Sequence, residues 1–232
     1  MTFNFIYFNI FKLSLHKISE LNFNKLQIEG LYSTIQNKII IKDEPNFNPE
    51  IIVGFDVSYR RIAIASCVAW NIQRRRVEEE LTKKMKIPAK YIPGRFALRE
   101  LPLLVEIISK LTLKIDCLIL DGHGIAHPEK AGLASFAGVL FNLPAVGCTK
   151  NILVGEYEFP DLRRGQYSNV IYNSEKVGEV LCTKDNIKPI FVSPGHLISF
   201  ESARKLIIKL AINSKYPEPL RLADINTRKF RS

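Results

Sequence analysis

The pattern of hydrophobic and polar residues predicts an α/β fold that opens with a helix and three strands. Residues 26–41 carry apolar side chains at mixed three- and four-residue steps, which predicts a helix ending near Lys42. Two β-branched runs, residues 51–57 and 61–70, are separated by a short polar turn and predict an antiparallel hairpin. Residues 77–84 predict a third strand, so three strands follow one another at the start of the fold.

After residue 96 the pattern changes to helices that alternate with strands. The first of these helices has its apolar positions on one face, and residues 117–121 form the continuous apolar run typical of a central strand buried on both faces. The later elements are a helix over 131–141, a strand over 144–150, a hairpin over 169–183, a strand over 189–193, a helix over 198–212 and a last helix after Pro219. This order predicts an RNase H-like α/β fold, with a mixed central sheet of three antiparallel strands followed by parallel strands, and flanking helices.

The length and composition are those of one globular domain. Of the 232 residues, 47% are hydrophobic and 24% are charged, a balance that favours a compact fold over a disordered chain. We expect residues 21–232 to form a single domain. Residues 1–20 are an N-terminal leader that the sequence leaves open: an added strand, a disordered tail, or sequence upstream of the true start.

The cysteines and the hydropathy indicate a reducing compartment. The four cysteines lie far apart, mostly inside apolar runs, without the spacing of a metal site, and we expect buried free thiols: Cys67, Cys117, Cys148 and Cys182. No run is long and apolar enough for a membrane-spanning helix. We therefore expect a cytoplasmic protein that has no membrane partner and functions as a monomer.

The net charge points to a polyanionic partner. Thirty-three Lys and Arg against 23 Asp and Glu give a formal charge of +10 and a pI near 9.4. The basic residues gather in several short clusters, including Arg74–Arg76, Lys83–Lys84 and Arg163–Arg164. This distribution favours nucleic acid over a membrane, and a solvated basic surface is the alternative.

Several acids stand where predicted elements begin or end. Asp56 is placed at the end of the first strand, Asp121 at the end of the central strand, and Glu100 near the start of the first crossover helix. The carboxyl ends of neighbouring parallel strands meet in one crevice, so these side chains can converge, with Asp224 on the last helix as a fourth candidate. Carboxylates that converge from different elements can hold the divalent metals of phosphodiester hydrolysis. The alternative is that they are solvated surface acids, although Asp56 and Asp121 each close an apolar run.

Six sequence blocks resemble the endonuclease V family of deoxyinosine 3′ endonucleases. In order they are "GFDVSY", "YIPGRFALRELP", "DGHGIAHPEKAGLASFAGV", "PAVGCTK", "SPGH" and "PEPLRLAD". The resemblance implies an RNase H-like fold, dependence on Mg²⁺ for which Mn²⁺ can substitute, and nicking of DNA at the second phosphodiester bond 3′ to deoxyinosine, leaving a 3′-hydroxyl and a 5′-phosphate. Asp56, Glu100 and Asp121 match the catalytic, metal-binding acids of the family.

The resemblance also assigns contacts to DNA. Tyr91 matches the aromatic wedge that fills the gap left by an extruded base, on a turn formed with Ile92, Pro93 and Gly94. Lys150 matches a lysine that can hold the scissile phosphate, and we count it as catalytic.

The block after Asp121 supplies the expected base contacts. Gly122 and Gly124 would let backbone N–H groups approach the extruded base, and His127 matches the histidine before the proline. His123 is at a variable position and receives no role. The chain departs from the family at Glu129, where an Arg is common, and at Asp224, where some members have His.

Two other functions remain open at the level of sequence. The substrate could be inosine in RNA or a structured nucleic acid such as a flap or mismatch. The chain could also be a non-catalytic nucleic-acid-binding module on the same scaffold, although the intact acids argue against this.

Overall fold

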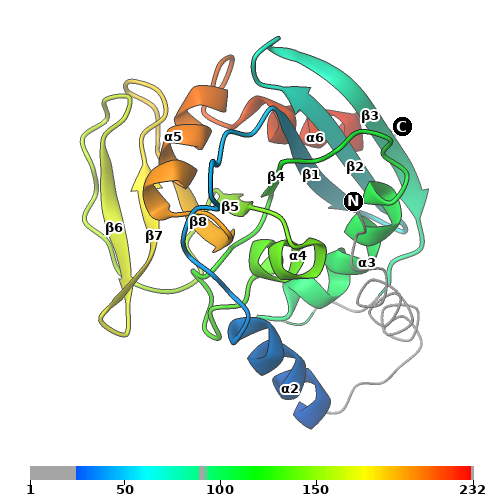
Figure 1. Cartoon of the computed structure of the whole chain (residues 1–232), viewed down its shortest axis with the longest axis horizontal. Coiled ribbons are helices and arrows are strands. Elements are labelled where there is room, and N and C mark those ends of the chain that lie inside the picture. Colours follow the sequence, from blue (N-terminus) through cyan, green and yellow to red (C-terminus); the bar gives the residue numbers. More distant parts are fainter. Residues whose placement is uncertain (1–24, 89–91, 93, 231–232) are drawn as a thin grey trace.

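The computed structural model describes residues 25–88, 92 and 94–230, which form five helices and eight strands (Figure 1). In chain order they are α2 (Lys25–Gln36), β1 (Ile51–Tyr59), β2 (Ala63–Asn71), β3 (Arg76–Met85), α3 (Phe96–Ile108), β4 (Cys117–Leu120), α4 (Leu133–Phe141), β5 (Ala145–Thr149), β6 (Tyr167–Tyr172), β7 (Glu175–Leu181), β8 (Ile190–His196), α5 (Phe200–Leu210) and α6 (Glu218–Lys229). The expected leader, residues 1–20, lies outside the described residues.

All eight strands form one mixed sheet in the order β3-β2-β1-β4-β5-β8-β7-β6. The first three strands pair antiparallel, as predicted, and β1, β4 and β5 run parallel in the centre. The remaining strands β8, β7 and β6 pair antiparallel and extend the sheet to its far edge, opposite β3 in Figure 1. The mixed α/β sheet expected from the sequence is confirmed.

Helices cover both faces of the sheet, and alternate residues of the central strands point to different helices. Val53 and Phe55 of β1 join a core with α2, α3 and α4, whereas Ile52 joins a core with α5 and α6. On β4, Leu118 and Leu120 face the first core and Ile119 faces the second. The central strands are therefore buried on both faces, which explains their unbroken apolar runs.

The predicted elements are present, with differences at their ends. The first helix ends at Gln36 and not near Lys42. Beyond it, the N–H of Ile40 donates to Nδ1 of His196 at 3.2 Å and its carbonyl accepts from the N–H of Leu197 at 2.7 Å. Because these backbone groups bond to a distant segment, the chain leaves the helix although the apolar spacing continues.

Two expectations drawn from composition agree with the structure as far as it is described. All four cysteines are buried and free. The described part of the chain contains no helix with the length and apolar character needed to cross a membrane.

Candidate active site

The register of the sheet places Asp56 and Asp121 side by side. The parallel ladder between β1 and β4 ends where Phe55 pairs with Leu120, and an aspartate is the next residue on each chain. The side-chain alternation of the strands turns both aspartates toward α6. Asp56 lies within β1, which continues to Tyr59, so its predicted position at the strand end is wrong. The strand extends further because its antiparallel pairing with β2 outlasts its parallel pairing with β4.

Asp56 is buried, Asp121 is half-buried, and the two carboxyl groups lie close together. Asp56 is 6% exposed, and its Oδ2 accepts a hydrogen bond from the Thr227 hydroxyl at 2.8 Å. Burial raises the pKa of both carboxyls; for Asp121 the nearby Asp56 adds to this effect and the pKa reaches about 7. The Asp224 carboxylate also raises the pKa of both groups, and the charge of Lys150 lowers it. The charge of Asp56 therefore makes ionisation of Asp121 more costly.

Glu100 approaches this pair from the opposite helical layer. It lies in the second turn of α3 and is 2% exposed. Burial raises its pKa well above the usual value, and the charges of Asp56 and Asp121 raise it further. Glu100 is therefore close enough to both aspartates to interact with them electrostatically. We call Asp56, Glu100 and Asp121 the acid cluster.

An aromatic and a cation stand beside Glu100. The hydroxyl of Tyr59 lies next to the carboxyl and lowers its pKa, as does the charge of Arg99. The Arg99 guanidinium lies 3.8 Å from the centroid of the Tyr59 ring. Neither residue was singled out from the sequence, although Arg99 precedes Glu100 and Tyr59 lies three residues after Asp56.

The acid cluster has the chemistry of a divalent-cation site but is not a preformed cage. Within residues 25–88, 92 and 94–230, no group of three or more His, Cys, Asp or Glu side chains has the spacing to hold a metal by itself. The acids nevertheless bury negative charge that the described side chains do not neutralise by an ion pair. Carboxylate oxygens suit Mg²⁺, and a cation among them would remove the cost of their burial.

Asp224 lies at the edge of the cluster. Its charge raises the pKa of Asp56 and Asp121, but its Oδ1 accepts a hydrogen bond from Arg228 Nε at 2.9 Å. Helix α6 comes this close to β1 because Gly54 has no side chain: a Cβ there would be 2.3 Å from the carbonyl carbon of Pro219.

Lys150 follows β5 directly and is exposed. Its charge lowers the pKa of both Asp56 and Asp121, which places it on the open side of the acid cluster. Because β4 and β5 run parallel, Lys150 and Asp121 lie at the same end of the sheet.

The glycines after Asp121 have a packing explanation. A Cβ on Gly124 would be 2.2 Å from the carbonyl oxygen of Pro194, and one on Gly122 would be 3.0 Å from Cβ of Leu133. The space at both positions is filled by the protein itself, so close packing of the loop on β8 and α4 already requires small residues. Their contact with an extruded base stays a prediction.

His127 holds two segments together. The N–H of Glu129 donates to its Nδ1 at 3.2 Å, so the ring proton is on Nε2, which donates to the Gly94 carbonyl at 3.0 Å. Arg95 forms an ion pair with Glu129, and its guanidinium lies 4.3 Å from the centroid of the Tyr32 ring. We call Tyr32, Gly94, Arg95, His127 and Glu129 the clasp, because they tie the start of α3 to the loop after Asp121.

The predicted wedge can be placed only in part. Tyr91 and Pro93 lie outside the described residues. Ile92 is 50% exposed, and Gly94 has a φ of +73°, the conformation that a tight turn with glycine allows.

Several partners of these residues could not be predicted from the sequence. Thr227 donates a hydrogen bond to Asp56. The sequence offered one indication of this: Thr227 lies one turn after Asp224 on α6, on the same face as that candidate acid. Arg95 and Tyr32 carried no motif of their own. The departure at Glu129 was visible, but its partner became clear only from the fold.

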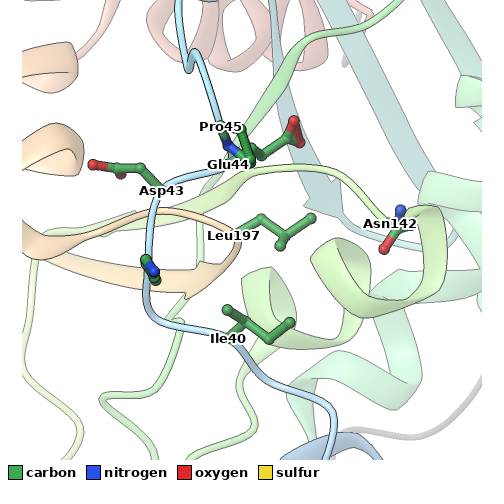
Figure 2. A pocket seen from close by; sticks show the side chains of 7 residues that line it. Ile40, Asp43, Glu44, Pro45, Asn142 and Leu197 are labelled. Carbon is green, nitrogen blue, oxygen red and sulfur yellow. The ribbon is translucent and has the colours of Figure 1, made fainter.

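A shallow cavity of about 400 Å³ lies away from the acid cluster (Figure 2). Asn142 precedes β5 and Leu197 follows the antiparallel β8, so the cavity is at the opposite end of these strands from Lys150. Its Asp43 accepts hydrogen bonds from the backbone and hydroxyl of Ser199 and from the hydroxyl of Ser202. This carboxylate stabilises the start of α5.

Known proteins match nearly the whole described fold. The sequence profile of the Endonuclease V family matches residues 33–225. Endonuclease V of Dictyoglomus thermophilum is 39% identical over 191 residues, which cover 82% of this chain and 84% of that protein. The solved Endonuclease V from Streptomyces avermitilis is 31% identical with a TM-score of 0.83, covering 89% of this chain and 92% of the other.

A second solved structure contains nucleic acid. Endonuclease V of Ciona intestinalis, in complex with a 24-mer DNA containing an inosine followed by a ribo-adenosine, is 25% identical with a TM-score of 0.78. The match covers 88% of this chain and 96% of that one. The RNase H-like fold and the nuclease activity expected from the sequence are thereby confirmed. With its paired aspartates on neighbouring parallel strands, the chain belongs to the Endonuclease V family, nucleases that hydrolyse phosphodiester bonds.

Proposed function

We propose that this protein is a Mg²⁺-dependent repair endonuclease that nicks DNA at the second phosphodiester bond 3′ to deoxyinosine, leaving a 3′-hydroxyl and a 5′-phosphate. The observation that carries the proposal is the acid cluster: three buried or half-buried carboxyl groups, from β1, α3 and the end of β4, have pKa values raised by burial and by neighbouring carboxyl groups, without an ion-pair partner among the described residues. The Ciona protein, solved with inosine-containing DNA, favours this substrate.

In the proposed mechanism the acid cluster supplies the ligands, with Asp56 and Asp121 as the central pair and Glu100 from the other layer. Bound Mg²⁺ would activate the attacking water and stabilise the leaving oxygen. Thr227 donates a hydrogen bond to one oxygen of Asp56, and the carboxyl group would supply a metal ligand from the position that this bond holds. Because Asp224 is already bonded to Arg228, its role would be to raise the pKa of Asp56 and Asp121, and it would not be a required metal ligand.

Lys150 and the clasp would position the substrate. Lys150 is exposed beside the acids, where its charge can hold the scissile phosphate and the negative charge that develops on it. His127 would act on the base through the loop that it anchors. Tyr91, with Ile92, Pro93 and Gly94, would fill the gap in the duplex, while Gly122 and Gly124 bring backbone close to the extruded base.

The proposal is tested with a labelled duplex that carries a single deoxyinosine. We expect one nick, at the second phosphodiester bond on the 3′ side, in Mg²⁺ and in Mn²⁺ but not in EDTA. A duplex with adenine in place of inosine is the matched control. Cleavage that is equal on both duplexes, or that persists in EDTA, would reject the proposal.

The same assay separates DNA from RNA as substrate. The Ciona complex places a ribo-adenosine after the inosine, so single-stranded RNA with one inosine is tested beside the DNA. Faster cleavage of the RNA would make the protein an inosine-specific ribonuclease, with the same acids in the same roles.

A further inference from the structure

A second group of charged residues lies at the same end of the sheet as the acid cluster. Strand β5 ends at Thr149, which pairs with Phe191 near the start of the antiparallel β8. Lys150 follows the one strand and Lys188 precedes the other, so both lie at the end of the sheet where β4 delivers Asp121. These lysines therefore lie at the same end of the sheet as Asp121.

The loop between α5 and α6 brings a third lysine to this place. The Nζ atoms of Lys150 and Lys215 lie 5.6 and 5.4 Å from the centroid of the Tyr216 ring. Nζ of Lys215 also donates to the carbonyl of Lys188 at 3.0 Å, which holds it beside that residue. We call Lys150, Lys188 and Lys215, with Tyr216 between them, the lysine cluster.

The loop that carries Lys215 is braced in this position. The Thr183 hydroxyl donates to the Lys215 carbonyl at 2.7 Å, and Lys184 Nζ donates to the Asn213 carbonyl at 3.2 Å. The Arg164 guanidinium donates to the Ala211 carbonyl at 3.1 Å. The cations of this region bond to backbone carbonyl groups, so their bonds shape the loop without neutralising the charge.

The lysine cluster differs from other cations of the described chain in its pairing. Within the described chain, none of its three lysines forms a salt bridge, whereas Lys176, Arg221 and Arg228 each bridge to a carboxylate. Lys215 is half-buried, and burial followed by the charges of Lys188 and Lys150 lowers its pKa. Holding like charges this close costs free energy unless an anion binds among them.

We propose that Lys188 and Lys215 form a binding site for a backbone phosphate of the nucleic-acid strand, adjacent to the phosphate that Lys150 holds. The acid cluster repels a polyanion, so the strand needs cations next to the acids to bring its phosphates there. The inference rests on the proposed function only in taking nucleic acid as the ligand. It adds a subsite that reads no sequence and no damaged base.

The test measures how salt weakens binding. Each lysine is changed to glutamine, and affinity for two duplexes, one with a single deoxyinosine and one undamaged, is measured by fluorescence anisotropy in Ca²⁺ over a range of KCl concentrations. Each contact with a phosphate contributes about 0.9 to the slope of log Kd against log salt. We expect Lys188→Gln and Lys215→Gln each to lower that slope by about 0.9 and to weaken binding about fivefold at 0.15 M salt, equally for both duplexes.

The matched control is Lys114→Gln, since Lys114 lies before β4 at the opposite end of the sheet. Lys215→Arg keeps the charge and should keep the slope, which separates phosphate binding from a structural role of the side chain. Unchanged slopes in both glutamine variants, or an equal change in Lys114→Gln, would overturn the proposal. If the wild type nicks at inosine but both glutamine variants keep its salt slope, this subsite alone is rejected. If the glutamine variants lower the slope but the wild type does not nick, the proposed function alone is rejected.

Discussion

The loop after β4 joins two polar regions that differ in how their charges are satisfied. At its start, Asp121 belongs to the acid cluster, where burial and neighbouring carboxyl groups raise the pKa of each acid. Six residues later, His127 belongs to the clasp, where both ring nitrogens are hydrogen-bonded and Arg95 pairs with Glu129. The same short loop therefore carries one region that opposes folding and one that supports it.

The difference separates structural polar residues from functional ones. Buried polar groups that serve the fold have partners, because an unpaired buried group costs about 1–3 kcal/mol. The carboxyl groups of the acid cluster have no ion-pair partner among the described side chains. Residues that lower stability in this way are typical of sites that serve catalysis or binding. The clasp holds the start of α3, and so Glu100, against the loop that begins at Asp121, which keeps the costly acids in register.

The largest effect is expected from Asp121→Asn. Nicking should fall by about a thousandfold or more, since loss of a ligand removes several kcal/mol of transition-state stabilisation. Folding stability without metal should stay equal or rise, because a half-buried carboxylate that is repelled by Asp56 is gone. Single-turnover nicking and urea unfolding in EDTA measure the two effects.

Asp161→Asn is the control, because Asp161 is exposed and lies outside the acid cluster. Its activity and stability should match those of the wild type. If Asp121→Asn instead lost stability and kept its activity, the distinction between the two regions would fail.

A change in the clasp should have the opposite signature. His127→Ala removes two hydrogen bonds and a buried ring, and should lower the free energy of unfolding by about 2–4 kcal/mol. Tyr32→Phe removes one hydroxyl, whose bond to the Gly94 carbonyl is long at 3.4 Å, and should cost less than about 0.5 kcal/mol. Urea unfolding of both variants checks the order; a stable His127→Ala protein would mean that the clasp does not hold the loop.

The ion pair of the clasp should contribute less than the histidine. Arg95 and Glu129 are partly exposed, so Glu129→Gln should cost about 0.5–1 kcal/mol. The reversed pair, Arg95→Glu with Glu129→Arg, should recover part of this loss. Equal losses in the single and reversed variants would show that the ion pair itself adds nothing.

The last expected effect is a dependence of stability on pH, in which groups of opposite sign offset one another. The pKa of Asp121 is about 7 in the folded protein and near 3.8 when unfolded, so between these values the folded state binds more protons and stability falls as pH rises. His123 and His196 act in the opposite sense, because their pKa of about 4 is below the unfolded value of 6.5. Stability from these two therefore rises with pH over that range.

Subtracting the curve of Asp121→Asn from that of the wild type isolates the carboxyl. The free energy of unfolding is measured with urea in EDTA. The value for the wild type minus that for Asp121→Asn should fall from about pH 4 to about pH 7 and stay constant above pH 7. A flat difference would mean that Asp121 is not held in a field of like charges.

The order and type of the elements could be predicted because apolar periodicity records burial directly. The alternating faces of β1 and the unbroken run of β4 follow from a sheet covered on both sides. Asp56 and Asp121 were found because each closes such a run. The residues after Gln36 were misplaced, since their backbone bonds to His196 and Leu197 depend on segments far along the chain.

The partners of the site could not be predicted for the same reason. The bond from Thr227 to Asp56 joins residues 171 positions apart, and Arg95 meets Glu129 across 34. Such contacts depend on the approach of helices to the sheet, as at Gly54 and Pro219, and no local pattern encodes them. Lys188 and Lys215 were likewise two basic residues among 33 until the fold placed them beside Lys150.

The most direct test of the acid cluster as a cation site is the effect of Mg²⁺ on thermal unfolding at pH 7.5. If wild-type protein binds the ion with a Kd near 1 mM, 10 mM Mg²⁺ should stabilise it by about 1.4 kcal/mol relative to EDTA. Asp121→Asn should show little of this gain, and Asp161→Asn should show all of it. An equal response of wild type and Asp121→Asn, or no response in any of the three proteins, would contradict the account.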